Sequence, residues 1–129
     1  MSAADGRPLR IAVVADDLIW ATRLLDAVRR AGADTVAVRR GADLPAGLLG
    51  ASGVIVDTSA RGYDPLAALQ AARDAGVPAI AAAPHDDPAL RRAALEAGAS
   101  RVHPYRELHE RGDRVISRWL DSLDPAVGR

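Results

Sequence analysis

The sequence contains no cysteine, which excludes disulfide bonds, thiolate zinc sites and a cysteine nucleophile. Phenylalanine is also absent and aromatic residues make up only 3% of the chain, so we expect a core of Ala, Val, Leu and Ile. No apolar run approaches the roughly 20 residues of a membrane helix. The N-terminus lacks the apolar segment of a signal peptide. We therefore expect a cytoplasmic protein.

Neither sign of charge is in excess, because 17 Lys and Arg residues balance 17 Asp and Glu residues. Nucleic-acid and membrane surfaces require a surplus of basic residues, so we expect neither as a partner. The stretch AVVADDL after the first apolar run has no glycine, which speaks against NAD, ATP or FMN. A chain of 129 residues has the size of one domain.

Short apolar runs alternate with amphipathic stretches along the chain. Runs typical of strands buried on both faces occur at 9–15, 35–38, 53–56, 78–83 and 100–103. Helical spacing of apolar residues, with capping Asp, Pro or Gly at several ends, predicts helices at 17–30, 44–50, 65–75, 88–98 and 106–123. Gly112 lies inside the last helix and predicts an early interruption.

This alternation predicts one domain over residues 8–123, with flexible tails at 1–7 and 124–129. We expect an α/β fold in which a five-stranded parallel sheet is doubly wound, with helices on both faces. Right-handed crossovers leave few topologies, and the flavodoxin-like strand order 2-1-3-4-5 is the commonest at this size. In such sheets the functional site lies at the carboxyl ends of the strands.

Three aspartates lie at those ends. Asp16 and Asp17 follow the first strand, and Asp57 follows the third. Clustered carboxylates repel one another, so they bind a hard cation such as Mg²⁺ or take up protons. Alternatively, Asp16 or Asp17 caps the first helix and Asp57 caps a turn. The positions of these aspartates favour neither the cation or proton site nor the capping roles over the other. His85 follows the fourth strand, at the rim of the same site.

Three stretches carry a resemblance to a known family: VVADD, VIVDTSARGYDP and VPAIAAAPHDDPALRRAALEAGA. They resemble the receiver domain of bacterial response regulators, which belongs to two-component phosphorelay signalling. The typical receiver reads VVDDD after the first strand and VLLDLNMPGMDG at the third. The similarity covers Leu9 to about Leu123 and is most specific around the fourth strand and the helix that follows it.

The resemblance implies a set of site residues. Receivers accept a phosphoryl group on an aspartate from a phosphohistidine of a partner kinase, and Asp57 falls on that phosphoacceptor. Asp16 falls on the acidic residue that holds Mg²⁺ directly, with Asp17 as a further candidate. Ser59 falls on the residue whose backbone carbonyl completes the metal shell. The implied partners are a histidine kinase and a downstream signalling protein.

Several positions depart from the receiver pattern. Ala15 replaces the first acidic residue, and Ala83 replaces the Thr or Ser that binds a phosphoryl oxygen, a hydrogen bond that a methyl group cannot make. Tyr105 replaces the lysine that neutralises the phosphoryl group. Each loss at Ala83 and Tyr105 would cost on the order of 2–4 kcal/mol of transition-state stabilisation. Arg61 and Arg106 are candidates for a substitute cation.

These departures lead to three hypotheses. The first is a stand-alone, non-enzymatic receiver-like domain with a degenerate phosphorylation switch that acts by binding a protein. A homodimer through the fourth and fifth helices, where arginines gather, is one version of it. The second is a working Mg²⁺-dependent phosphoacceptor at Asp57. The third is a small enzyme that uses Asp16, Asp57 and His85.

Overall fold

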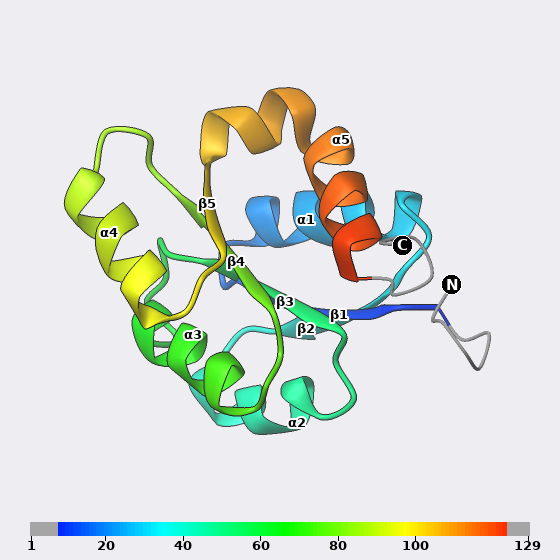
Figure 1. Cartoon of the computed structure of the whole chain (residues 1–129), viewed down its shortest axis with the longest axis horizontal. Coiled ribbons are helices and arrows are strands. Elements are labelled where there is room, and N and C mark those ends of the chain that lie inside the picture. Colours follow the sequence, from blue (N-terminus) through cyan, green and yellow to red (C-terminus); the bar gives the residue numbers. More distant parts are fainter. Residues whose placement is uncertain (1–7, 124–129) are drawn as a thin grey trace.

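The computed structural model describes residues 8–123, and the tails predicted at 1–7 and 124–129 lie outside this range (Figure 1). The strands are β1 Arg10–Val14, β2 Asp34–Val38, β3 Gly53–Asp57, β4 Ala79–Ala83 and β5 Arg101–Pro104. The helices are α1 Leu18–Arg30, α2 Leu44–Leu48, α3 Pro65–Asp74, α4 Pro88–Ala97 and α5 Tyr105–Leu123, with a 3₁₀ turn at Gly41–Asp43 before α2.

The five strands form one parallel sheet in the order β2-β1-β3-β4-β5. β3 lies at the centre, where Val56 pairs with Val14 of β1 on one side and with Ala81 of β4 on the other. The predicted flavodoxin-like fold class is therefore confirmed.

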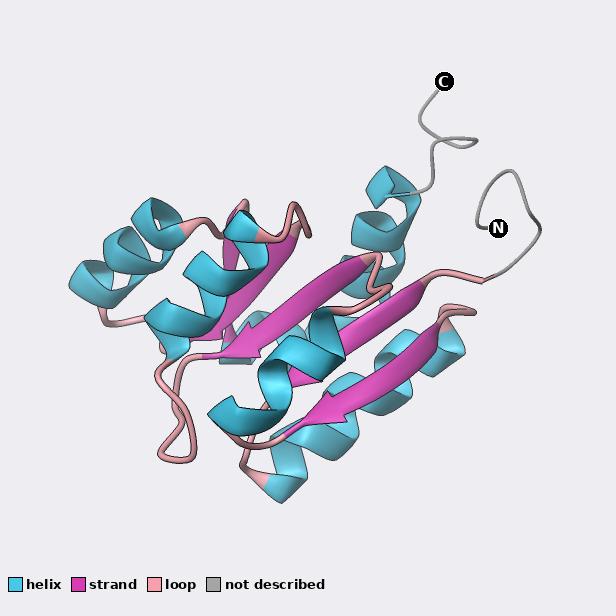
Figure 2. Cartoon of the chain, turned by 90° about the horizontal axis from the view of Figure 1, so that it is seen from below, coloured by secondary structure: helices cyan, strands magenta, loops and turns pink. Residues whose placement is uncertain are grey.

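Helices cover both faces of the sheet, with α1 and α5 on one side and α2, α3 and α4 on the other (Figures 1 and 2). Successive side chains of a strand point to opposite faces, so each strand feeds both layers. Ile11 and Val13 pack with α1 and α5, whereas Ala12 and Val14 pack with α2 and α3. A strand buried on both sides therefore needs the unbroken apolar runs that the sequence contains.

Aliphatic residues fill the core, as expected from the lack of phenylalanine. Every residue of β4, AIAAA, is buried, and its small side chains let the helices approach the sheet. Trp119 of α5 is also buried and lies over the start of β3. A Cβ atom added at Gly53 would stand 2.8 Å from the Trp119 ring, so this packing requires glycine there.

Helix ends follow the predicted signals closely. Asp87 accepts a hydrogen bond from the Leu90 backbone N–H at the start of α4, and the helix ends at Gly98, whose φ is 128°. The predicted interruption of α5 is present, because Arg111, next to Gly112, has non-helical angles (φ −135°, ψ 25°).

The boundaries of most elements differ from the sequence prediction by one or two residues. α2 ends at Leu48 instead of residue 50, because Leu49 has an extended backbone and Gly50 has a φ of 72°. β3 extends one residue further than predicted and includes Asp57. Within residues 8–123 no helix is both long enough and apolar enough to cross a membrane.

Candidate functional site

Asp57 is the last residue of the central strand β3, and its side chain is completely buried. Its Oδ1 accepts a hydrogen bond from the Ser59 backbone N–H at 3.0 Å, which closes the turn after the strand. Its Oδ2 is buried and has no hydrogen-bond partner among the described residues. A buried carboxylate oxygen without a partner is costly, so this atom is the clearest candidate for contact with a ligand or cation.

The Tyr105 hydroxyl closes the other side of Asp57. Tyr105 is the first residue of α5, and its hydroxyl donates a hydrogen bond to Asp57 Oδ1. The Ser59 hydroxyl lies 2.7 Å from the same phenol oxygen and the Ser59 backbone nitrogen lies 3.2 Å from it. A neutral donor thus occupies the position at which the receiver pattern has a lysine. The sequence identified Tyr105 as a loss, but not as a partner of Asp57.

Burial controls the ionisation of this pair. Desolvation raises the pKa of Asp57, and the charges of Asp16 and Asp17 raise it further. The hydrogen bonds from Tyr105 and Ser59 lower the pKa of Asp57 without cancelling this rise. Burial and the Asp57 contact raise the pKa of Tyr105 to about 12, so the phenol remains a proton donor at neutral pH.

Asp16 holds the loop between β3 and α3. Its Oδ2 accepts hydrogen bonds from the backbone N–H groups of Arg61 at 2.8 Å and Gly62 at 2.7 Å, and these bonds lower the pKa of Asp16. A Cβ atom at Gly62 would lie 2.7 Å from the Arg39 carbonyl oxygen. The loop can therefore approach Asp16 this closely only because residue 62 is glycine.

Asp17 is the N-cap of α1. Its Oδ1 accepts hydrogen bonds from the backbone N–H groups of Ile19 at 2.9 Å and Trp20 at 3.0 Å. The helix-cap interpretation therefore describes Asp17, and the turn-cap interpretation describes one oxygen of Asp57. Both roles leave the second oxygen of each carboxylate to other partners.

Tyr63 is a site residue that the sequence analysis missed. It is buried, and its hydroxyl lies 2.7 Å from the Val14 carbonyl oxygen and 2.6 Å from that of Asp57. The single phenolic proton thus serves the carboxyl ends of both β1 and β3. Burial raises the pKa of Tyr63, which keeps this donor protonated. An isolated tyrosine six residues after Asp57 was the available signal.

Ala83 and His85 border a small cavity beyond the end of β4. Ala83 is buried and belongs to the core on the α3 and α4 side, whereas His85 is exposed. The cavity has a volume of about 90 Å³ and is also bordered by Asp87 and Arg91. Pockets for small molecules usually measure about 300–1,000 Å³. This cavity therefore offers little room for a substrate.

The residues around Asp57 fit a hard cation. The unpartnered Asp57 Oδ2 and the negative charge of Asp16 supply oxygen ligands of the kind that Mg²⁺ prefers. Ser59 belongs to the same turn and carries the backbone carbonyl that the receiver pattern assigns to the metal. Among the described residues, no group of three or more His, Asp or Glu side chains gathers as a ready-made metal site.

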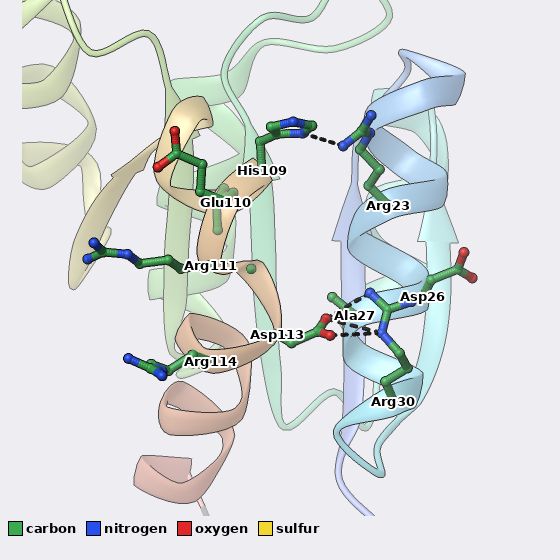
Figure 3. Close-up of a pocket in the computed structure, with 11 residues that line it drawn as sticks. Arg23, Asp26, Ala27, Arg30, His109, Glu110, Arg111, Asp113 and Arg114 are labelled. Atoms are coloured by element: carbon green, nitrogen blue, oxygen red, sulfur yellow. Dashed lines mark hydrogen bonds and ion pairs between the residues drawn. The ribbon is translucent and has the colours of Figure 1, made fainter.

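A polar groove lies between α1 and α5 (Figure 3). The Trp20 ring lies on Tyr105 with ring centroids 4.8 Å apart, and the Arg23 guanidinium lies 5.8 Å from the Trp20 ring centroid. His109 contacts Arg23 across the groove. Further along, Arg30 binds Asp113 through two nitrogens, at 2.7 Å in its closest contact. These exposed contacts join the two helices and orient the start of α5.

No protein-family model matches the sequence, and no curated protein matches it. Solved structures do match, and those most similar include response-regulator receiver domains. NtrX from Brucella abortus superposes with a TM-score of 0.79 and 19% identity, over 90% of this chain and 27% of NtrX. A probable response regulator with a GGDEF domain gives 0.78 and 18%, over 89% of this chain and 50% of its own length. The chain thus spans half or less of these two proteins.

Other similar structures are receiver domains of comparable length. The receiver domain of the TMAO respiratory response regulator TorR gives a TM-score of 0.70 and 23% identity, over 86% of this chain and 98% of that domain. The receiver domain of a Pseudomonas aeruginosa sensor histidine kinase, with a magnesium ion in its active-site cleft, gives 0.73 and 19%, over 88% and 98%. The chain therefore has the fold of response-regulator receiver domains.

Proposed function

We propose that this chain is a receiver-like signalling domain that acts by binding a partner protein and is not switched by phosphorylation of Asp57. The observation that carries the proposal is the hydrogen bond from the neutral Tyr105 hydroxyl to Asp57. In the receiver pattern a lysine pairs with the phosphoryl group on the aspartate. In this chain a phosphoryl group on Asp57 would meet the neutral Tyr105 phenol instead. The implied partners are a histidine kinase or a downstream protein of a two-component pathway.

The fourth strand supports the same proposal. A switch requires contacts that differ between its two states. Ala83 is buried and carries no hydroxyl that could follow a phosphoryl oxygen, and Tyr105 already has a partner in Asp57. Both groups that would distinguish the two states are therefore missing.

A second candidate function is a working phosphoacceptor, and the unpartnered Asp57 Oδ2 favours it. In this version an Asp57 oxygen attacks the phosphorus of a phosphohistidine. A P–O bond forms, the P–N bond breaks and the neutral imidazole leaves after taking up a proton. Mg²⁺ held by Asp57, Asp16 and the Ser59 carbonyl would supply positive charge at the acceptor.

A small enzyme built on Asp16, Asp57 and His85 is disfavoured. Asp57 is fully buried, and Asp16 binds two backbone N–H groups. The cavity of about 90 Å³ next to His85 is too small for most substrates. We therefore propose a non-enzymatic role.

Phosphorylation by a small phosphodonor separates the two candidates. The chain is incubated with acetyl phosphate and Mg²⁺, and the intact mass is measured over time. We compare it with the double variant Ala83→Thr/Tyr105→Lys, which regains the hydroxyl and the cation, and with Asp57→Ala. We expect the double variant to gain one phosphoryl group while the unchanged chain stays unmodified.

Two comparisons keep this experiment decisive. An active receiver domain in the same reaction verifies the phosphodonor, and circular dichroism verifies that the variants are folded. Phosphorylation of the unchanged chain as fast as the active domain, and its loss in Asp57→Ala, would overturn the proposal in favour of the second candidate.

A further inference from the structure

A groove of about 660 Å³ runs along the outer side of α5, between this helix and the edge strand β5. It shares Arg111 and Arg114 with the groove that faces α1, and its other lining residues differ. In Figure 3 His109 and Asp113 point toward α1, whereas Arg111 and Arg114 point away from it.

Positive charge dominates this outer groove. Its lining includes four arginines, Arg101, Arg111, Arg114 and Arg118, and a single acid, Glu107. Glu107 already pairs with His103 at 2.6 Å. Within residues 8–123 none of the four arginines forms an ion pair with an acidic side chain. Since the whole chain has zero net charge, this surface is a local concentration of positive charge.

The groove also has an apolar floor. Val115 and Leu123 are half-buried and border it together with one edge of Trp119. Arg114 and Arg118 are four residues apart in the regular part of α5, and Arg111 at the kink borders the same groove, so all three lie beside this floor. Guanidinium groups beside an apolar strip fit a ligand that combines carboxylates with apolar side chains.

We propose that this groove binds an acidic, amphipathic peptide segment of a partner protein. The segment places apolar side chains on Val115 and Leu123, and its Asp or Glu carboxylates pair with the flanking arginines. Arginine binds a carboxylate with two parallel hydrogen bonds, so such a site selects the orientation of the carboxylate as well as its charge. The inference rests on the proposed function and adds to it the chemical character of the partner's binding segment.

The same features disfavour two other occupants. A twofold dimer brings the same patch of both copies together, so the four arginines of one copy would face those of the other. Nucleic acid binds through many phosphate contacts and needs an excess of basic charge, whereas this chain is neutral and the centre of the groove is apolar.

A binding titration tests the proposal directly. The probe is a fluorescein-labelled helical peptide with Glu on one face and Leu on the other, and its anisotropy is measured against the full chain. We expect the double variant Arg114→Glu/Arg118→Glu to weaken binding by at least about tenfold. The matched control Arg40→Glu/Arg92→Glu changes charge equally, at exposed positions outside the groove, and should bind like the unchanged chain.

Two further measurements test separately the roles of charge and of apolar contact. A peptide with Lys in place of every Glu should bind Arg114→Glu/Arg118→Glu more tightly than it binds the unchanged chain. Val115→Ser should weaken the Glu peptide by about threefold or more, because it removes apolar contact without changing charge. Equal loss of binding in the groove variant and in its control would overturn the proposal, as would tighter binding of duplex DNA than of the peptide. Self-association of the chain that the groove variant abolishes would also overturn it.

Failure here can be distinguished from failure of the proposed function. The titration is repeated with acetyl phosphate and Mg²⁺, and the proposed function expects no change in affinity. A peptide that binds through the arginines only after Asp57 is phosphorylated would overturn the proposed function and retain the groove. A peptide that ignores the arginines in an unphosphorylated chain would overturn the groove alone.

Discussion

At the scale of single residues, Asp57 and Tyr105 determine the character of the site. A fully buried carboxylate with one unpartnered oxygen sits against a phenol that remains protonated at neutral pH. The pair stabilises the turn after β3 through Ser59.

Replacing Asp57 with Asn should stabilise the protein at neutral pH. The ordinary pKa of the group is 3.8 and burial raises it in the folded state, so folded Asp57 holds its proton more strongly than unfolded Asp57. Stability contributed by this group therefore falls as pH rises from 3.8 through the folded-state pKa. We expect Asp57→Asn to raise the free energy of unfolding by about 1 kcal/mol at pH 7.

Thermal unfolding at several pH values measures this effect. The gain from Asp57→Asn should disappear near pH 4, where the carboxyl of the unchanged protein is protonated in the folded state. Added Mg²⁺ should raise the melting temperature of the unchanged chain only if the cation binds, and should not raise that of the variant. The measured quantity is the stability of Asp57→Asn minus that of the unchanged chain. A smaller difference at pH 7 than at pH 4 would contradict this account of burial.

Replacing Tyr105 with Phe should destabilise the protein, because Asp57 loses its side-chain donor. We expect a loss of about 1–3 kcal/mol at pH 7, the usual cost of leaving a buried polar group without a partner. The loss should shrink at acid pH. Urea unfolding measures it, and a double-mutant cycle with Asp57→Asn isolates the contact. A loss of the same size in the unchanged chain and in the Asp57→Asn variant would show that the hydroxyl does not act through the charge of Asp57.

At the scale of elements, the loop between β3 and α3 is held by backbone groups. Asp16 accepts two of its N–H groups, and Gly62 permits the approach to Arg39. The Tyr63 hydroxyl reaches back to β1 and β3 from the same loop. The loop is therefore held by the Asp16 carboxylate and by the carboxyl ends of β1 and β3.

Gly62→Ala should destabilise the protein by about 1–3 kcal/mol, because its Cβ would lie 2.7 Å from a backbone oxygen that cannot rotate away. Gly112→Ala is the matched control, since a Cβ atom there meets nothing within 4 Å. It should be neutral or should stabilise α5 by up to about 1 kcal/mol. Chemical denaturation measures both, and a costlier Gly112→Ala would refute this explanation of the loop.

The sequence predicted the elements better than the contacts between them. Hydrophobic periodicity, helix-capping residues and helix-breaking residues are local features of the sequence. The five strands, the capping Asp87 and the interruption near Gly112 could therefore be predicted from it. The partners of Asp16 and the Tyr105 partner of Asp57 come from distant segments, and their identity depends on how the loops pack. Tyr105 is 48 residues from Asp57 in the chain, and nothing local indicates that the two side chains touch.

At the scale of the whole molecule, stability should be greatest at the centre of the sheet. β3 is paired on both sides and every residue of it is buried, whereas β2 and β5 are edge strands. We expect amide hydrogen exchange to be slowest in β1, β3 and β4 and faster in β2 and β5. Exchange monitored by NMR checks this order. Slower exchange in β5 than in β3 would indicate that a partner or a second copy covers this edge.

The contact between the Trp20 and Tyr105 rings has a practical consequence. Trp119 is buried in the core, so Trp20 is the tryptophan that lies next to the aspartate site. We expect its emission to respond to changes at Tyr105, the ring that hydrogen-bonds to Asp57, so that ultraviolet excitation of the unlabelled chain reports on that carboxylate. Trp20 is thus an intrinsic fluorophore that is separated from Asp57 by the Tyr105 side chain.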